Sequence, residues 1–312
     1  MSIAPPGELS IYPNVHSTDT PPGESQSDAP DLLHPLLARK PEVVWVHTGG
    51  TRVEVLVWGQ RGLPGLFLLH GAGAHAHWWD SVAPLLATQY RVAAMSLPGN
   101  GASEWRDRYS SAAFFEDACA CVTATSLDAA AKPVFIGHSM GGAHLMHGAI
   151  HAPESMAGLV LIDTSFRSTG GGKPHTGDPV RRIFATEDEA LGRFRLAPPG
   201  PAREPGLLKH VARHALMQVV GPNGEAGYSW RADPAYWKKF ERGVEQGPYA
   251  QPLRPRVRTA HLIAEQSDVA TASLPLGEEV PRILLPECGH HVMLDQPLLL
   301  AASLRALLAV WP

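Results

Sequence analysis

The sequence is poor in cysteine, in charged side chains and in long apolar runs. Its 312 residues include three cysteines and 18% charged side chains, with 26 lysines and arginines against 30 aspartates and glutamates. Three cysteines provide neither a disulfide framework nor a cysteine-rich zinc site. The net charge of −4, without a long run of one sign, excludes the basic surface expected of a nucleic-acid-binding protein. No stretch of about 18 apolar residues occurs, so no membrane partner is expected.

The first 40 residues also lack features that would indicate structure or export. Residues 1–30 have no basic start followed by an apolar segment, so no secretory signal is predicted and a cytoplasmic protein with reduced cysteines is expected. Residues 1–40 are rich in proline, serine and acidic side chains and show no helical or strand period. We therefore predict that they form a flexible or surface-lying extension.

What the sequence does contain is a regular alternation of apolar strands and helical segments. Hydrophobic residues make up 44% of the chain, enough for a sizeable core. Continuous apolar strands separated by helices are typical of a parallel sheet that is covered on both faces. We predict an α/β fold, with a mostly parallel, doubly wound sheet of about eight strands, formed by residues 41–163 and 256–312. The alternation breaks over residues 164–255, which are rich in glycine and proline and are predicted to be an insertion.

The motif GHSMG, residues 137–141, follows the apolar segment PVFI and precedes a helical one. It matches the G-x-S-x-G pattern, in which a sharp turn from strand to helix exposes a serine hydroxyl. Ligands of open α/β sheets bind at the carboxyl ends of the strands, where Ser139 would lie. We therefore predict that Ser139 is a nucleophile.

A serine nucleophile needs a base to accept its proton and a carboxylate to orient that base. His290 and Asp268 each follow a late apolar strand, and the order serine, aspartate, histidine is typical of this kind of fold. We predict Asp268 and His290 as the partners of Ser139. Two alternatives remain open: His291 as the base, and Asp163, which ends the preceding strand, as the carboxylate.

The negative oxygen formed during attack needs backbone N–H donors. Met140, at the start of the helix after the nucleophile, and Ala72, in the glycine-containing segment LLHGAGAH, are the candidate donors. Four aromatic residues are candidates for the wall of a pocket for a small-molecule substrate, although each has the character of a core residue too: Trp78, Trp79, Phe166 and Trp230.

One segment partly matches a metal-binding pattern. HAHWWD, residues 75–80, is similar to the HxHxDH motif of metallo-β-lactamase-type hydrolases. Trp79 stands where that motif has its aspartate, and Asp80 stands where it has its next histidine. Because the spacing fails, no metal site is predicted, and no cofactor is expected.

Taken together, the motifs resemble the α/β-hydrolase superfamily over about residues 42–312. The matching segments are HGAG (70–73), Trp78, PGNGAS (98–103), GHSMGG (137–142), QSD (266–268) and GHHVMLDQP (289–297). The resemblance implies that the histidine directly after the glycine, His290, is catalytic, that Asp295 is the acidic residue five positions later, and that Ala72 is an oxyanion donor. It also implies that residues 164–255 form a helical cap over the site. One departure is Ser96, because the family often has an aspartate there.

These features predict a serine hydrolase that cleaves carboxylic esters through an acyl-enzyme. The carbon–carbon bond hydrolases of this family are an alternative, but they usually read GNSxGG and carry a tryptophan after the catalytic histidine. Here those positions hold His138 and His291, so ester hydrolysis is favoured. A non-catalytic ligand-binding protein on the same fold is the second alternative, and the sequence leaves open whether the chain forms a homo-oligomer.

Overall fold

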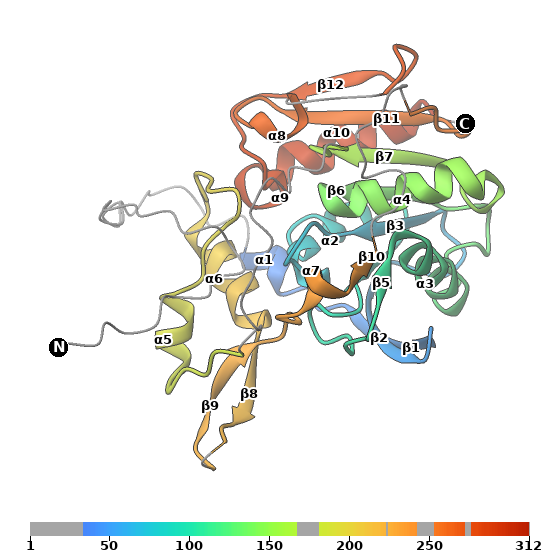
Figure 1. The fold of residues 1–312 in the computed structure, drawn as a ribbon. Coiled ribbons are helices and arrows are strands. Elements are labelled where there is room, and N and C mark those ends of the chain that lie inside the picture. The colour runs from blue at the N-terminus through green and yellow to red at the C-terminus, as the bar shows by residue number, and fades with distance from the viewer. Residues whose placement is uncertain (1–33, 167–180, 223, 242–252, 272–275, 312) are drawn as a thin grey trace.

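An eight-stranded sheet forms the centre of the computed structural model, which describes residues 34–166, 181–222, 224–241, 253–271 and 276–311 (Figure 1). The strand order across the sheet is β1-β2-β4-β3-β6-β7-β11-β12. The pairs β1–β2 and β2–β4 are antiparallel, and the strands from β4 to β12 are parallel. The strands are β1 (Glu42–Thr48), β2 (Thr51–Trp58), β3 (Gly65–Leu69), β4 (Arg91–Met95), β6 (Val134–His138), β7 (Gly158–Ile162), β11 (Thr259–Ala264) and β12 (Arg282–Leu285). The predicted fold class is therefore confirmed.

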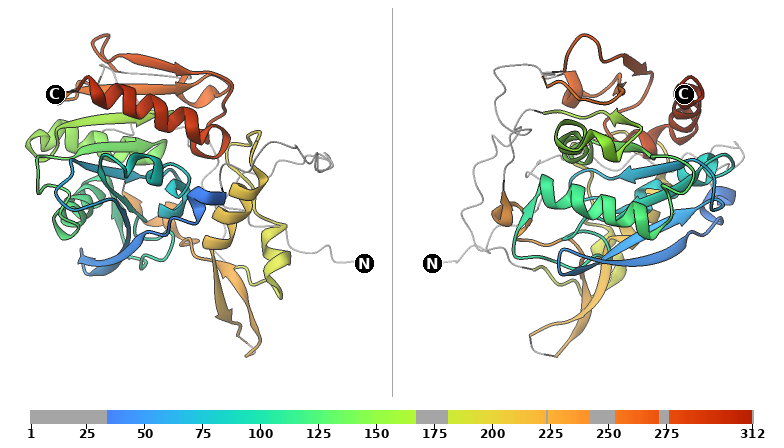
Figure 2. Two further views of the ribbon diagram at one scale, coloured as in Figure 1. Left: turned by 180° about the vertical axis from the view of Figure 1, so that it is seen from behind. Right: turned by 90° about the vertical axis from the view of Figure 1, so that its right-hand side faces the viewer.

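Helices cover both faces of this sheet. Helices α3 (Ser111–Ala124) and α4 (Met140–His151) pack on one face, and α2 (Ala83–Leu86) and α10 (Pro297–Ala309) pack on the other (Figure 2). Strand β3 shows why, because Phe67 and Leu69 enter one apolar cluster whereas Leu66 and Leu68 enter the other. Successive side chains of a strand point to opposite faces, so a strand that is apolar throughout needs cover on both.

Short elements complete the core. They are α1 (His34–Leu37), the 3-10 helices η1 (Ala76–Trp79) and η2 (Pro153–Ser155), β5 (Tyr109–Ser110), α8 (Asp268–Thr271) and α9 (Val292–Asp295). None of the helices in the described ranges has the length and apolarity needed to cross a membrane.

The segment between β7 and β11 is called the cap below. Of its described residues, 181–222 and 224–230 project away from the sheet, whereas 236–241 lie against the core beside β5 (Figure 1). Its described part contains α5 (Glu187–Leu191), α6 (Pro205–His214), an antiparallel hairpin of β8 (Leu216–Val220) and β9 (Ala226–Trp230), α7 (Tyr236–Lys239) and β10 (Phe240–Glu241). The cap that was predicted to be helical therefore contains a β-hairpin besides its helices. The hairpin forms because LMQVV and AGYSW alternate buried and more exposed side chains, which is the period of a strand.

Part of the N-terminal extension is attached to the core. Leu36 of α1 is buried in the apolar cluster that contains Trp58, and the Trp58 indole N–H donates to the Arg39 carbonyl at 3.3 Å. The extension predicted to be flexible or surface-lying is therefore attached to the core at Leu36, because this apolar side chain is buried there. Residues 1–33 lie outside the described residues.

A buried ion pair joins the first hairpin to α3. Asp117 is 1% exposed and accepts hydrogen bonds from both terminal nitrogens of Arg106, at 2.7 and 2.9 Å. The same guanidinium donates to the Thr48 carbonyl and the Thr51 hydroxyl, each at 2.8 Å. With every charge paired and hydrogen-bonded, the cost of removing these groups from water is offset.

We predict that Asp117→Ala lowers the free energy of unfolding by about 3–5 kcal/mol, because it leaves the Arg106 charge buried without its partner. Urea denaturation followed by circular dichroism measures the change. The control is Glu241→Ala, which breaks a pair whose two side chains, Arg108 and Glu241, are 84% and 58% exposed; it should change stability by no more than about 0.5 kcal/mol. A similar small loss for both variants would contradict the prediction.

Candidate active site

Ser139 lies in the sharp turn between β6 and α4. Its backbone has φ 52° and ψ −124°, a region that residues with a side chain seldom adopt. Its N–H donates to the Ile162 carbonyl on the neighbouring strand at 2.9 Å, which holds the turn in place. The flanking glycines are required by space, since a Cβ on Gly137 would lie 2.5 Å from the Cα of Gly142, and one on Gly141 would lie 2.7 Å from the Leu69 carbonyl oxygen.

His290 connects the serine to a buried carboxylate. Its Nε2 lies 3.0 Å from the Ser139 Oγ, and its Nδ1 lies 2.6 Å from the Asp163 Oδ2. His290 is 5% exposed and Asp163 is fully buried. In this arrangement the Nδ1–H donates to the carboxylate, which leaves the Nε2 lone pair free to accept the serine proton. The structure thus brings Ser139 and His290 together as predicted.

The structure does not bring the predicted Asp268 to this histidine. Asp268 is exposed at the start of α8, whereas Asp163, the alternative, contacts His290. The segment after β11 does reach the site, but it directs the Ser267 hydroxyl toward Asp163, and Asp268, the next residue, begins α8 and is exposed. The assignment of Asp268 as the partner of His290 is therefore corrected to Asp163.

Two further groups hold the Asp163 carboxylate. Its Oδ1 accepts the Ala264 N–H at 3.1 Å, and its Oδ2 accepts the Ser267 hydroxyl at 2.5 Å. Ser267 was not predicted as a site residue from the sequence, although it directly precedes Asp268 in the QSD segment. The strand that was expected to supply the carboxylate supplies its hydrogen-bond donors instead.

Two neighbouring histidines fix the loop that carries His290. Burial, together with the nearby His290 and His291, lowers the pKa of His138 well below its usual value, so the ring is neutral and its Nε2–H donates to the His290 carbonyl at 2.8 Å. Burial and the neighbouring His290 likewise lower the pKa of His291 to about 3. The His291 Nε2–H donates to the Pro198 carbonyl of the cap at 3.0 Å. The alternative base therefore binds the cap, and His290 contacts Ser139.

Asp295 supports the same loop from the other side. Its Oδ2 accepts the Gly289 N–H at 2.9 Å, directly before His290. This contact agrees with the acidic residue that the family resemblance implied five positions after the histidine.

The segment HGAG runs alongside the serine. A Cβ on Gly71 would lie 3.0 Å from the Ser139 Cβ, so only glycine lets this loop approach so closely. His70 braces the loop, because its Nδ1–H donates to the Gly71 carbonyl at 2.7 Å and its Nε2 accepts the Leu97 N–H at 2.9 Å. Burial lowers the pKa of His70 to about 4, which keeps the ring neutral.

The candidate oxyanion donors lie on the two segments that flank Ser139. Met140 is the first residue of α4, and the first N–H groups of a helix have no partner within the helix. Ala72 is exposed and follows Gly71 in the adjacent loop. Their roles as donors stay predictions.

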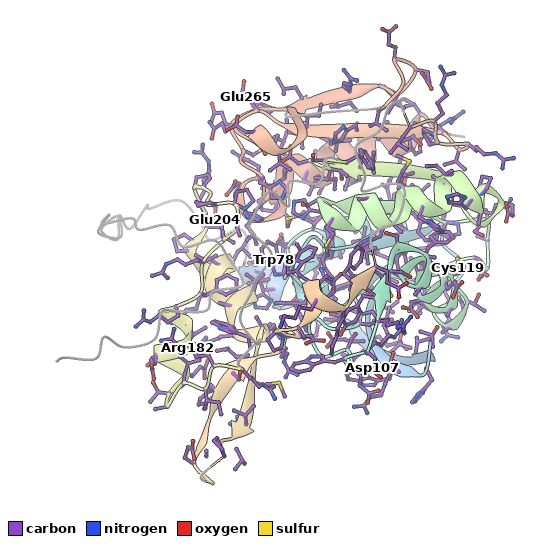
Figure 3. All side chains as sticks on the ribbon, in the orientation of Figure 1. Trp78, Asp107, Cys119, Arg182, Glu204 and Glu265 are labelled. Atoms are coloured by element: carbon purple, nitrogen blue, oxygen red, sulfur yellow. The ribbon has the colours of Figure 1, made fainter. Side chains whose placement is uncertain are left out.

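The four aromatic candidates do not form one group. Trp78 and Trp79 are buried in the apolar cluster on the α10 side of the sheet, and Trp230 packs against that cluster from the cap. Phe166 belongs to the cluster on the opposite face. The Trp78 ring contacts the ring of His291, next to His290, at a centroid distance of 5.3 Å. Figure 3 labels Trp78 between the cap and the sheet.

Position 96, where the family often has an aspartate, holds a serine that is hydrogen-bonded to a carboxylate from another strand. The Ser96 hydroxyl donates to the Glu54 Oε2 at 2.7 Å and accepts the Ala76 N–H at 3.0 Å. Glu54 is buried and also accepts the Ala102 N–H at 3.2 Å. A charged residue within the apolar strand RVEVLVW was the signal in the sequence for this contact.

A serine on a sharp turn after β6, a histidine after β12 and a carboxylate after β7 meet at one edge of the sheet, which is the arrangement typical of one large class of α/β hydrolytic enzymes. The chain belongs to the alpha/beta hydrolase family, whose sequence model matches residues 66–303. The predicted superfamily and enzyme class, a hydrolase, are confirmed.

Two curated proteins match most of the chain. Lipase LipV of Mycobacterium tuberculosis is 29% identical over 272 residues, which is 81% of this chain and 97% of the lipase. The probable protein phosphatase methylesterase 1 of Caenorhabditis elegans is 27% identical over 264 residues, 80% of this chain and 69% of the relative.

Solved structures share the fold. The thioesterase domain from the curacin biosynthetic pathway aligns with a TM-score of 0.64 at 21% identity, covering 86% of this chain and 99% of the domain. The esterase Rv0045c from Mycobacterium tuberculosis aligns with a TM-score of 0.62 at 23% identity, covering 90% of this chain and 97% of that protein.

We predict that Asp163→Asn lowers kcat for ester hydrolysis by up to about 10⁴-fold, because the amide would favour the wrong tautomer of His290. Asp268→Asn is the matched control, and it should retain nearly the full rate because Asp268 is exposed. Both variants are compared on p-nitrophenyl acetate, with circular dichroism to verify folding. Loss of activity in the Asp268 variant alone would overturn the assignment of the carboxylate.

Proposed function

We propose that this protein is a serine esterase that hydrolyses carboxylic esters through an acyl-enzyme on Ser139. The observation that carries the proposal is the chain of contacts from the Ser139 Oγ through His290 to Asp163, with the serine held at a positive φ. Lipase and methylesterase relatives support ester hydrolysis as the general reaction. The roles of the individual residues are proposed from the contacts within this chain.

In the first step, the Ser139 oxygen attacks the carbonyl carbon of the ester while the His290 Nε2 accepts the serine proton. Asp163 stabilises the imidazolium that forms, through the 2.6 Å contact with Nδ1. When the tetrahedral intermediate collapses, the carbon–oxygen bond to the alcohol breaks and His290 returns the proton to the leaving alkoxide. The acyl group remains on Ser139.

In the second step, water replaces the alcohol. His290 accepts a proton from the water as its oxygen attacks the acyl carbon, and then returns the proton to Ser139 as the acid leaves. The N–H groups of Ala72 and Met140 are proposed to bind the negative oxygen in both steps. The preorganised hydrogen bonds of His70 support this role, because a donor loop that is already fixed needs no reorganisation during the reaction.

The cap is proposed to limit access of water and to shape the pocket for the acyl group. The contact of His291 with Pro198 brings the cap to the residue next to the catalytic histidine. Trp78, which touches His291, is the residue that we propose as part of the pocket wall. Because His138 and His291 differ from the asparagine and tryptophan that carbon–carbon bond hydrolases of the family usually carry at these positions, ester hydrolysis remains the proposed reaction.

We predict that a fluorophosphonate probe labels the wild type at Ser139 and does not label Ser139→Ala. The variant should lose about 10⁴- to 10⁶-fold in kcat, because the nucleophile is removed, while its fold is retained. Mass spectrometry identifies the labelled peptide, and a series of p-nitrophenyl esters of increasing acyl length measures the rates. One control is Ser155→Ala, on η2, which should be labelled as the wild type is. The other is heat-unfolded wild type, which should not be labelled.

Either of two results would contradict the proposal. If Ser139→Ala hydrolysed esters at close to the wild-type rate, Ser139 would not be the nucleophile. Turnover of a vinylogous 1,5-diketone without turnover of any ester would identify carbon–carbon bond cleavage instead.

A further inference from the structure

A second group of chemically reactive side chains lies where the cap meets the core. His77 and Asp80 come from η1 and the residue that ends it, and His210 and His214 come from α6 of the cap. One potential ligand atom from each of the four lies within 4.8 Å of the others. None of these residues belongs to the Ser139 site.

The contacts within this group converge on one oxygen. The His77 Nδ1 lies 2.9 Å from the Asp80 Oδ2, and the His210 Nε2 lies 2.7 Å from the same atom. The other oxygen, Oδ1, is buried and has no hydrogen-bond partner among the described residues. Leaving a carboxylate oxygen buried and unpaired costs free energy, so a further positive partner would be stabilising here.

The third histidine is stacked against the first. The rings of His77 and His214 are parallel within 19° at a centroid distance of 3.5 Å, and the rings of His210 and His214 are 4.7 Å apart. One nitrogen of His214 also lies within 4.8 Å of the ligand atoms of the other three residues.

We infer that His77, Asp80, His210 and His214 form a binding site for Zn²⁺. Three imidazoles and one carboxylate are ligands that zinc prefers, and tetrahedral zinc with bonds of 2.0–2.1 Å needs ligand atoms about 3.3 Å apart. The two contacts with the Asp80 Oδ2 are shorter than that, at 2.9 and 2.7 Å, and all four ligand atoms lie within 4.8 Å of one another. Because zinc lies in the plane of each imidazole that binds it, binding requires the stacked rings of His77 and His214 to rotate toward a common point. His210 and His214 are four residues apart, which places both on one face of α6.

An outer carboxylate supports the same assignment. The His77 Nε2 lies 4.0 Å from the Glu54 Oε1, on the far side of the ring from Asp80. When the Nδ1 lone pair binds zinc, the proton of the neutral ring is on Nε2 and faces Glu54. Histidines that bind metals usually direct their second nitrogen to a carboxylate or carbonyl in this way.

The site would act as a cross-link between the two parts of the molecule. Two ligands come from the core and two from the cap, 130 residues apart for the pair Asp80 and His210. All four positions of a tetrahedral ion are filled by protein atoms, which is typical of structural rather than catalytic zinc. Bound zinc would therefore hold α6 against η1, and the inference does not depend on the proposed esterase reaction.

No metal site was predicted for the segment HAHWWD because its spacing does not match the HxHxDH motif, and the segment contains only two of the four proposed ligands. His77 and Asp80 have no third and fourth ligand within that segment, and His210 and His214 belong to a separate helix. The ligand set is assembled only when the cap folds onto the core.

We predict that the metal-free wild type binds one Zn²⁺ per chain, as measured by equilibrium dialysis and elemental analysis. The double variant His210→Gln/His214→Gln should bind at least about 100-fold more weakly, because it removes two of four ligands. The matched control is His147→Gln/His151→Gln, which removes another pair of histidines four residues apart, on α4, and should bind as the wild type does. Zinc should raise the Tm of the wild type and of the control, and not that of the cap variant.

Cobalt provides a test that needs no variant. Co²⁺ bound to the wild type should give the intense visible absorption of tetrahedral coordination, and Zn²⁺ should remove it. Weak octahedral absorption, less than one ion per chain, or equal zinc binding by the wild type and a folded His210→Gln/His214→Gln variant would overturn the proposal and leave a hydrogen-bonded histidine cluster.

Discussion

The backbone of Ser139 is the constraint on which the site depends. Its positive φ is maintained because β6 and α4 meet at a turn that has no room for a side chain at Gly137 or Gly141. The hydrogen bond from the Ser139 N–H to Ile162 ties this turn to the strand that ends beside Asp163. Ser139 and Asp163 are therefore positioned by the same pair of neighbouring strands, and the strain at the serine is offset by the surrounding sheet.

Neutral, buried histidines fix the groups around that turn. His70 braces the glycine loop, and His138 holds the backbone of His290. Burial lowers the pKa of both rings, so each has one donor and one acceptor nitrogen, and the hydrogen bonds it makes have a fixed direction. The positions of the reacting atoms are therefore determined by uncharged contacts that bring no additional positive charge next to His290.

The cap is attached to the core by polar contacts in several places. His291 binds Pro198 near the site, and the Tyr109 hydroxyl donates to the Asp233 Oδ2 at 2.7 Å farther from it. Asp233 in turn pairs with Lys239 at 2.8 Å. The histidine cluster at α6 adds a third attachment. Contacts of this kind give a cap a defined position while keeping the interface more polar than a core.

The sequence by itself determined the sheet, the turn at Ser139 and the histidine loop, because each depends on local properties: apolar strands alternating with helices, glycines where no side chain fits, and a histidine after the last strand. It did not determine which aspartate contacts His290, since Asp163 and Asp268 both follow strands that end at the same edge of the sheet, and only the folded loops place Asp163 against the ring and leave Asp268 exposed. The sequence also did not predict that the cap contains a hairpin besides its helices. Nor did it predict that His77 and Asp80 of the core lie against His210 and His214 of the cap. Those contacts join segments far apart in the chain, so only the tertiary structure decided them.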